Sequence, residues 1–176
     1  MKTTVYVGTS LDGFIARKDG NIDWLVQFQD KDVHDSYAEF MQRIDAIVIG
    51  RGTYETVLSY PSWPYDKKVF VLSTTIKEIP NSLEGKATVL SMKPKELLSH
   101  LSAEGFSTIY IDGGKVIQSF LKADLVDEMI ITRVPMLIGS GISLFGHLDN
   151  DLSFTHIQTK VHSDGLVKSY YERKRD

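Results

Sequence analysis

The chain has 176 residues, 42% hydrophobic and 24% charged, which fits one soluble domain over residues 1–176. It has no cysteine, which excludes disulfides, thiolate metal sites and the His/Cys/Cys zinc centre of nucleobase deaminases. The formal net charge of −3 argues against a nucleic-acid partner, and no apolar run is long enough to span a membrane. We therefore expect a cytoplasmic protein.

The first part of the chain alternates strand-like and helix-like patterns. Short β-branched or apolar runs predict strands, and apolar residues at helical spacing or a proline at a helix start predict helices. The expected strands lie at residues 3–8, 46–49, 68–72 and 88–90, and the expected helices at residues 32–43, 52–59 and 94–103.

The second part continues the alternation and then changes character. A strand is predicted at 108–111, a helix at 115–122 and a long, buried strand at 127–134. Residues 152–161 and 166–172 alternate apolar and polar side chains around Ser163-Asp164-Gly165, which predicts an antiparallel hairpin. The fold class is therefore α/β, a mixed, mostly parallel sheet with flanking helices and a C-terminal antiparallel hairpin. The segments 16–30, 60–66 and 136–151 are candidate flexible loops, and Arg173-Lys174-Arg175 is interpreted as a solvated tail.

Three glycine-containing segments follow predicted strands: SLDGFIA at 10–16, IGRGTYE at 49–55 and IDGGKVI at 111–117. Glycine at a strand end lets backbone N–H groups approach a phosphate, and a helix that starts there adds its positive end. Two such junctions suit a dinucleotide. The sequence has no GxSxG elbow and no P-loop, and its five histidines show no pair at metal-ligand spacing, so no metal is expected.

The order of SLDGFIA, DAIVIGRGTYE, VLST and IDGGKVIQ, followed by a strand that ends in Ile131-Thr132, resembles the dihydrofolate reductase-like superfamily. Within it, the chain is similar to the C-terminal reductase domain of the bifunctional deaminase-reductase of riboflavin biosynthesis, as a stand-alone member. The resemblance spans residues 3–171. It implies a three-layer fold, NADPH across the carboxyl ends of the strands, and a homodimer.

The resemblance also assigns cofactor-binding residues. Arg51 offers a planar fork of donors to a phosphate, and Thr53 could cap the following helix; the alternative is a plain surface arginine beside a helix cap. The double glycine could equally be only a tight turn. The full cofactor set is Gly8, Ile15, Ala16, Gly50, Arg51, Gly52, Thr53, Leu72, Ser73, Thr74, Asp112, Gly113, Gly114, Lys115, Val116 and Ile117.

Two residues are expected at the reacting end. Asp35 lies near the place of the carboxylate that binds the pterin and assists protonation in dihydrofolate reductases. Thr132 resembles the threonine that supports this substrate site; alternatively, it satisfies its hydroxyl on the backbone. Trp24 could line the substrate mouth or plug the core.

The expected function is NADPH-dependent reduction of a small heterocycle or ribosylaminopyrimidine, similar to 5-amino-6-(5-phosphoribosylamino)uracil reductase of riboflavin biosynthesis. The sequence lacks the fused deaminase domain, so a riboflavin role would need that partner on another chain. The alternatives are pterin reduction of the dihydrofolate reductase type, and a non-catalytic NADPH-binding sensor or assembly protein.

Overall fold

The computed structural model describes residues 1–28 and 31–175, and the side chains of residues 31–34 lie outside that description. The strands are β1 (Lys2–Thr9), β2 (Phe14–Ala16), β3 (Ala46–Gly50), β4 (Lys68–Leu72), β5 (Ala87–Leu90), β6 (Thr108–Asp112), β7 (Glu128–Arg133), β8 (Ile142–Ser143), β9 (Phe154–Val161) and β10 (Val167–Arg173). The helices are α1 (Asp23–Val26), α2 (Lys31–Gln42), α3 (Arg51–Leu58), α4 (Pro94–Ala103) and α5 (Gly114–Lys122), with a 3₁₀ turn at Asn81–Leu83.

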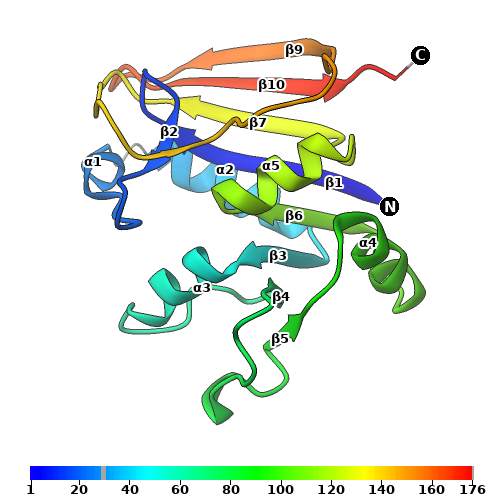
Figure 1. Cartoon of the computed structure of the whole chain (residues 1–176). Coiled ribbons are helices and arrows are strands. Elements are labelled where there is room, and N and C mark those ends of the chain that lie inside the picture. The colour runs from blue at the N-terminus through cyan, green and yellow to red at the C-terminus, as the bar shows by residue number, and fades with distance from the viewer. Residues whose placement is uncertain (29–30, 176) are drawn as a thin grey trace.

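Eight strands form one sheet in the order β5-β4-β3-β6-β1-β7-β10-β9 (Figure 1). Neighbouring strands from β5 to β7 are parallel. The last two strands form a hairpin, and β10 joins the sheet antiparallel to β7. This is the mixed, mostly parallel sheet with a C-terminal antiparallel hairpin that the sequence predicts.

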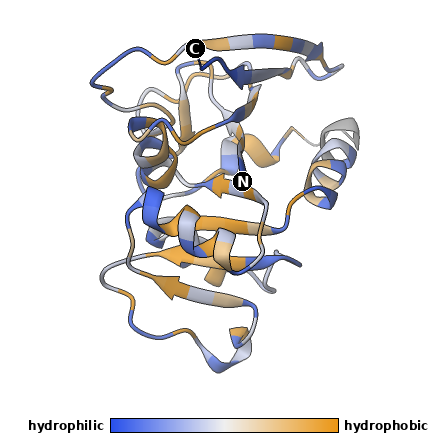
Figure 2. Ribbon diagram, turned by 90° about the vertical axis from the view of Figure 1, so that its right-hand side faces the viewer, coloured by the Kyte–Doolittle hydropathy of each residue, from blue (hydrophilic) through white to orange (hydrophobic). Residues whose placement is uncertain are grey.

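Helices cover both faces of the sheet and give it three layers. Side chains alternate between the faces along each strand, so Val5 and Val7 join one hydrophobic cluster while Tyr6 joins another. The first cluster includes residues of α4 and α5, and the second includes residues of α2 and α3. Figure 2 shows the hydrophobic residues concentrated on the central strands.

The predicted helices and strands are confirmed to within about two residues of their ends. The prediction missed α1, β2 and β8. Strand β8 lies inside the segment 136–151 and pairs with β2, although these strands have only two and three residues. Residues 29 and 30, at the end of the loop expected over 16–30, lie outside the described residues. No helix in the described part of the chain is long and apolar enough to cross a membrane.

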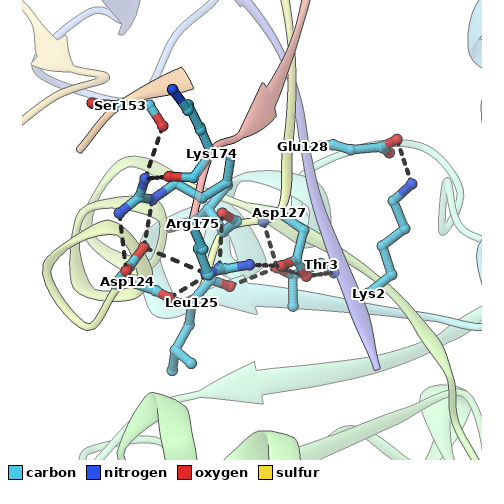
Figure 3. Close-up of polar contacts among 11 residues, drawn as sticks. Lys2, Thr3, Asp124, Leu125, Asp127, Glu128, Ser153, Lys174 and Arg175 are labelled. Carbon is cyan, nitrogen blue, oxygen red and sulfur yellow. Dashed lines mark hydrogen bonds and ion pairs between the residues drawn. The ribbon is translucent and has the colours of Figure 1, made fainter. Parts of the chain in front are cut away.

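Polar contacts join the two termini at the end of the sheet where β1 and β7 begin, which we call its amino end (Figure 3). The Thr3 N–H and hydroxyl donate to Asp127 Oδ2 at 2.8 and 3.1 Å, and Arg175 Nη1 lies 2.5 Å from Asp127 Oδ1. Arg173 Nε donates to Asp124 Oδ1 at 2.7 Å, and its side chain is only 10% exposed. The interpretation of the basic C-terminus as a solvated tail is therefore wrong.

Candidate functional site

The parallel strands end together at the opposite end of the sheet, which we call its carboxyl end. Strands β3 and β6 finish at Gly50 and Asp112, and each runs directly into a helix. Strands β3 and β6 are neighbours, with Ile49 opposite Asp112. The two glycine junctions therefore lie side by side, as a dinucleotide site requires.

The close approach of the two junctions depends on Gly113. This residue has φ +93°, a backbone conformation that glycine adopts without strain. A Cβ at Gly113 would lie 2.5 Å from Thr53 Oγ1 and 3.6 Å from the Gly50 nitrogen. The double glycine thus does more than make a turn: it lets β6–α5 pack against β3–α3.

Both helices begin with backbone N–H groups that lack a side-chain cap. The N-cap residues are Gly50 for α3 and Gly113 for α5, and no side chain of the described residues caps either helix. Thr53 is the third residue of α3, so the capping role considered for it is wrong. Uncapped N–H groups at two adjoining helix starts are suitable partners for the phosphates of a dinucleotide.

Strands β2 and β8 cover the start of α5. A Cβ at Gly114 would lie 2.7 Å from Ile142 Cγ2 and 3.3 Å from Ile15 Cδ1. Where β2 ends and β8 begins, a Cβ at Gly141 would lie 2.2 Å from the Ala16 carbonyl oxygen. We call residues 14–16 and 142–143 the β2/β8 flap. Ile15 and Ala16, both expected to bind the cofactor, are in this flap.

Asp12 holds the turn before the flap in place. Its carboxylate accepts hydrogen bonds from the Ser10 hydroxyl at 2.6 Å and from the Gly139 N–H at 2.8 Å. The Ser10 hydroxyl and these backbone donors lower the pKa of Asp12. Asp12-Gly13 is therefore a turn that also fixes the loop containing Gly139 to the flap.

The remaining cofactor candidates lie around the two junctions. Arg51 is exposed at the start of α3, and its Nε lies 3.7 Å from Glu55 Oε1, a weak surface pair. Lys115 is exposed at the start of α5. Leu72 pairs with Gly50, so the segment Leu72–Thr74 follows β4 beside the first junction. The Ser73 hydroxyl accepts the N–H groups of Thr75 and Ile76 at 3.1 and 3.0 Å, which shapes a local turn.

Thr132 lies on the face of the sheet that packs against α2. It pairs with Gly8 of β1 on one side and with Lys168 of β10 on the other. Its side chain is 4% exposed, and its hydroxyl has no hydrogen-bond partner among the described residues. The alternative that Thr132 satisfies its hydroxyl on the backbone is therefore wrong.

Asp112 is a carboxyl group that can hold a proton near neutral pH. Desolvation raises the pKa of Asp112 to about 6, although the Gly113 N–H, which donates to Oδ1 at 2.7 Å, acts in the opposite direction. Burial raises the pKa of Tyr37 to about 12, and the nearby Asp112 charge adds to this shift. The resemblance placed Asp112 among the expected cofactor-binding residues and gave it no role in proton transfer. Its place after a buried strand was a signal that it would be desolvated.

The other residues of the reacting end lie on α2 and α1. Asp35 is exposed on α2. The Oγ atom of its neighbour Ser36 lies 3.1 Å from the Tyr6 hydroxyl oxygen. Trp24 is 1% exposed and packs with Val134 and Leu166, so it is a core residue and does not line a substrate mouth.

The chain matches the family model described as RibD C-terminal domain over residues 2–168. It belongs to the RibD C-terminal domain family. Within the described residues there is no group of three His, Cys, Asp or Glu side chains that could hold a metal ion.

Two relatives match nearly the full length of this RibD-type chain. The Bacillus subtilis (strain 168) uncharacterized protein YwjB is 38% identical over 173 residues, 96% of this chain and 97% of the relative. A crystal structure of a candidate riboflavin biosynthesis protein from Shewanella sp. PV-4 is 46% identical with a TM-score of 0.94, and covers 99% of this chain and 100% of that one.

More distant structures show the fold alone. A deaminase/5-amino-6-(5-phosphoribosylamino)uracil reductase from Thermotoga maritima has a TM-score of 0.74 at 17% identity, and covers 98% of this chain and 56% of its own. Enterococcus faecalis dihydrofolate reductase complexed with NADP(H) has a TM-score of 0.69 at 17% identity, and the match covers 99% of this chain and 97% of that one. The fold is therefore dihydrofolate reductase-like, and family membership supports an oxidoreductase role.

Proposed function

We propose that this protein is an NADPH-dependent reductase of a small heterocycle or ribosylaminopyrimidine, similar to 5-amino-6-(5-phosphoribosylamino)uracil reductase. The observation that carries the proposal is the contact between two uncapped helix starts, where Gly113 approaches Thr53 and Gly50. Family membership supports reduction, and the Enterococcus faecalis dihydrofolate reductase, which shares the fold, was solved with NADP(H).

The proposed cofactor residues divide by the part of NADPH that each would hold. The backbone of Gly50, Gly52, Thr53 and Gly114 would donate N–H groups to the pyrophosphate, and Asp112 and Gly113 would form the turn that lets it approach. The exposed cations Arg51 and Lys115 would pair with phosphate charge, Leu72–Thr74 would border the adenosine 2′-phosphate, and Val116 and Ile117 would follow along the cofactor. Gly8, Ile15 and Ala16 would border the nicotinamide.

The chain's own residues have a limited chemical task in such a reaction. NADPH, when bound, supplies a hydride from its nicotinamide. The β2/β8 flap would exclude water from the reacting atoms, and a side chain must deliver one proton. Asp35 and Thr132 are proposed at this end of the site, as donor and as a hydrogen-bonding support for the substrate.

Asp112 is a second candidate for the proton donor. A carboxyl with a pKa near 6 keeps a proton closer to neutral pH than an ordinary aspartic acid does. Asp35→Asn and Asp112→Asn should therefore be compared in single-turnover experiments with saturating NADPH. The variant that loses turnover while it still binds NADPH identifies the donor.

We propose a homodimer as the assembly and the cytoplasm as the location. Strand β9 is the exposed edge of the sheet and carries Ile157 and Val161, which are 51% and 70% exposed. An edge strand with exposed apolar residues can pair with a second copy. Analytical ultracentrifugation of the wild type and of Val161→Lys would test this assembly.

The first experiment is a calorimetric titration with NADPH and with NADH. NADPH absorbance would then be followed with 5-amino-6-(5-phosphoribosylamino)uracil and, separately, with dihydrofolate. Oxidation by the pyrimidine supports the proposal, oxidation by dihydrofolate alone favours the pterin alternative, and binding without oxidation by either favours a sensor. The absence of NADPH binding would refute the assignment of all three glycine segments.

Arg51→Ala tests the phosphate site directly. Loss of a hydrogen bond to a charged group should weaken NADPH binding by about 1.5–3 kcal/mol. Arg43→Ala is a matched control, because Arg43 is similarly exposed and pairs with Glu128 at 3.1 Å, at the other end of the sheet. Equal NADPH affinity of the wild type and Arg51→Ala would remove Arg51 from the site.

A further inference from the structure

A segment rich in aromatic residues joins α3 to β4. The Trp63 ring lies edge-on to that of Tyr54 on α3, with ring centres 6.3 Å apart, and the Tyr65 ring lies edge-on to Trp63 at 5.4 Å. Trp63 and Tyr65 both pack against the hydrophobic cluster on the face of the sheet that α2 and α3 cover. The aromatic side chains therefore hold this segment against that face.

Tyr37 of α2 packs on the same face near the end of β6. Its ring lies edge-on to that of Tyr110 on β6, with ring centres 6.5 Å apart. Side chains two residues apart on a strand point to the same face, so Asp112 follows Tyr110 on the face where Tyr37 packs. Tyr37 thus lies near Asp112 at the carboxyl end of the sheet.

The charge of Asp112 also acts on Tyr65. Burial raises the pKa of Tyr65, and the charges of Asp112 and of ionised Tyr37 add to this shift. The pKa of Tyr37 is raised in the same way, by burial and by the Asp112 charge. Because the interaction between charges declines with distance, these three side chains, which come from three separate parts of the chain, lie in one neighbourhood.

The hydroxyls of Tyr37 and Tyr65 are open to a ligand. Neither hydroxyl makes a hydrogen bond to a described residue. Both side chains are half-buried, and neither hydroxyl is among the enclosed polar atoms, so solvent reaches both oxygens. Two donors of the same aromatic cluster, the Tyr54 hydroxyl and the Trp63 indole N–H, are enclosed without a described partner. A concentration of polar groups without partners is typical of a site that a ligand or bound water completes.

We propose that Tyr37 and Tyr65 bind the heterocyclic ring of the substrate near Asp112, each by donating a hydrogen bond from its hydroxyl to an acceptor atom of the ring. This inference rests on the proposed reductase function and deepens it. It adds two substrate-binding residues, one from α2 and one from the segment between α3 and β4, that the resemblance did not assign.

The charges around the two tyrosines indicate which part of a substrate lies there. Among the described residues, the charges that shift the pKa of Tyr37 and Tyr65 come from Asp112 and from other tyrosines, and no lysine or arginine contributes. No lysine or arginine contributes to the pKa of Asp112 either. A phosphate needs cations or several donors, whereas an uncharged ring needs only a few hydrogen bonds and apolar contact. A phosphorylated substrate would thus place its ring at the tyrosines and direct its phosphate away from them.

The test compares Tyr37→Phe, Tyr65→Phe and the double variant with the wild type. Each change removes a hydroxyl without a described partner, so the melting temperature should not fall. Affinity for 5-amino-6-(5-phosphoribosylamino)uracil in the presence of NADP+, measured by calorimetry, should fall roughly 2- to 10-fold in each single variant. In the double variant it should fall by about the product of the two factors. NADPH affinity should stay within about twofold, because the hydroxyls would not touch the cofactor.

Tyr171→Phe is the matched control. Tyr171 is also half-buried and its hydroxyl makes no hydrogen bond to a described residue, but it lies on β10 and packs against the other hydrophobic cluster. This change should leave the melting temperature and both affinities unaffected.

The outcomes separate this inference from the proposed reaction. Unchanged pyrimidine affinity in the double variant would overturn the inference and leave the reaction standing, and a clear fall in melting temperature would overturn it by assigning the hydroxyls a structural role. If the wild type binds dihydrofolate but not the pyrimidine, the proposed substrate fails, and the same losses measured with dihydrofolate would still support the two tyrosines. If the wild type binds NADPH but neither ring compound, the inference is overturned and the cofactor site remains.

Discussion

The two ends of the sheet use polar residues in opposite ways. At the amino end, Asp127 accepts two hydrogen bonds from Thr3 and pairs with Arg175, so charges and donors satisfy one another within the protein. At the carboxyl end, α3 and α5 begin without side-chain caps, and the Thr132 hydroxyl lacks a partner among the described residues. Loss of a polar side chain at the amino end should therefore reduce stability, whereas loss of a polar side chain at the carboxyl end should mainly affect binding.

The largest expected effect is that of Gly113→Ala. A non-glycine residue at φ +93° costs about 1–2 kcal/mol, and the new Cβ 2.5 Å from Thr53 Oγ1 should bring the total to about 2–4 kcal/mol. NADPH binding should be lost as the junctions separate. Urea denaturation and NADPH titration would measure both effects.

Gly52→Ala is the comparison for Gly113→Ala. Gly52 is helical, and no described atom lies within 4 Å of a Cβ placed there. This variant should stabilise the protein by about 0.5–1 kcal/mol, because alanine favours the helix. If Gly113→Ala is as stable as the wild type, the junctions are not in the described contact.

Asp127→Ala should be the most damaging change at the amino end among those considered. It removes the acceptor of the Thr3 N–H and hydroxyl and the partner of Arg175, and should cost about 2–3 kcal/mol in unfolding free energy. NADPH affinity should not change. Asp149→Ala provides a control, because its exposed pair with Lys122 is worth at most about 1 kcal/mol. A loss of NADPH affinity in Asp127→Ala would contradict the division between the two ends.

The pH dependence of stability should have opposite signs at the two ends. The pKa of Asp112 is raised to about 6 in the folded protein, whereas its ordinary pKa is 3.8. Between these two values the folded protein therefore holds a proton that the unfolded chain has released. This contribution favours folding below pH about 4 and is lost as pH rises to about 6, with an expected amplitude of about 1–2 kcal/mol after solvent screening. Asp112→Asn should not show this loss of unfolding free energy between pH about 4 and about 6, which urea denaturation at a series of pH values would measure.

At the amino end, Asp45 should act in the other direction. The Ser107 hydroxyl and the N–H groups of Ser107 and Thr108 donate to Asp45 Oδ2 at 2.7–2.9 Å and hold its pKa well below the usual range. Its stabilising contribution is present above the ordinary pKa and disappears as pH falls further. Asp45→Asn should therefore weaken the acid sensitivity of the wild type. An acid profile identical to the wild type would refute this assignment.

The smallest effect is expected from Thr132→Val, for which Thr4→Val is the comparison. Thr132→Val removes a hydroxyl without a described partner, so stability should change by less than about 1 kcal/mol or rise slightly. Thr4→Val removes a hydroxyl that donates to Glu128 Oε2 at 2.9 Å, and should cost about 1–2 kcal/mol. Thermal denaturation would compare the stability of the two variants. Equal destabilisation would show that the Thr132 hydroxyl has a hydrogen-bond partner in solution.

The sequence predicted the large elements and the glycine junctions because their signals are local. A β-branched run such as Ala46–Gly50 fits a buried strand wherever it pairs, and glycine after it permits a close approach. The β2/β8 flap gave no signal, since strands of two and three residues are too short to show a period. The contact of Gly113 with Thr53 joins residues that are 60 positions apart, and no local pattern encodes it.

Burial of polar side chains was the other gap in the prediction. In the alternating pattern of β10, Lys168 occupies a position typical of a solvent-facing residue. Its burial depends on α2, which covers that face and contributes Ser36 from 132 positions away. Arg173 and Arg175 likewise resembled a free tail, because their acidic partners Asp124 and Asp127 lie far away in the sequence, between α5 and β7.

The position of β1 also bears on how the chain folds during synthesis. This first strand lies between β6 and β7, whose residues are 108–112 and 128–133. On the ribosome, an early apolar strand therefore remains without its neighbours until residue 128 or later has emerged. Folding should consequently be slow for the size of the chain, and nascent chains that end before β7 should need chaperone protection.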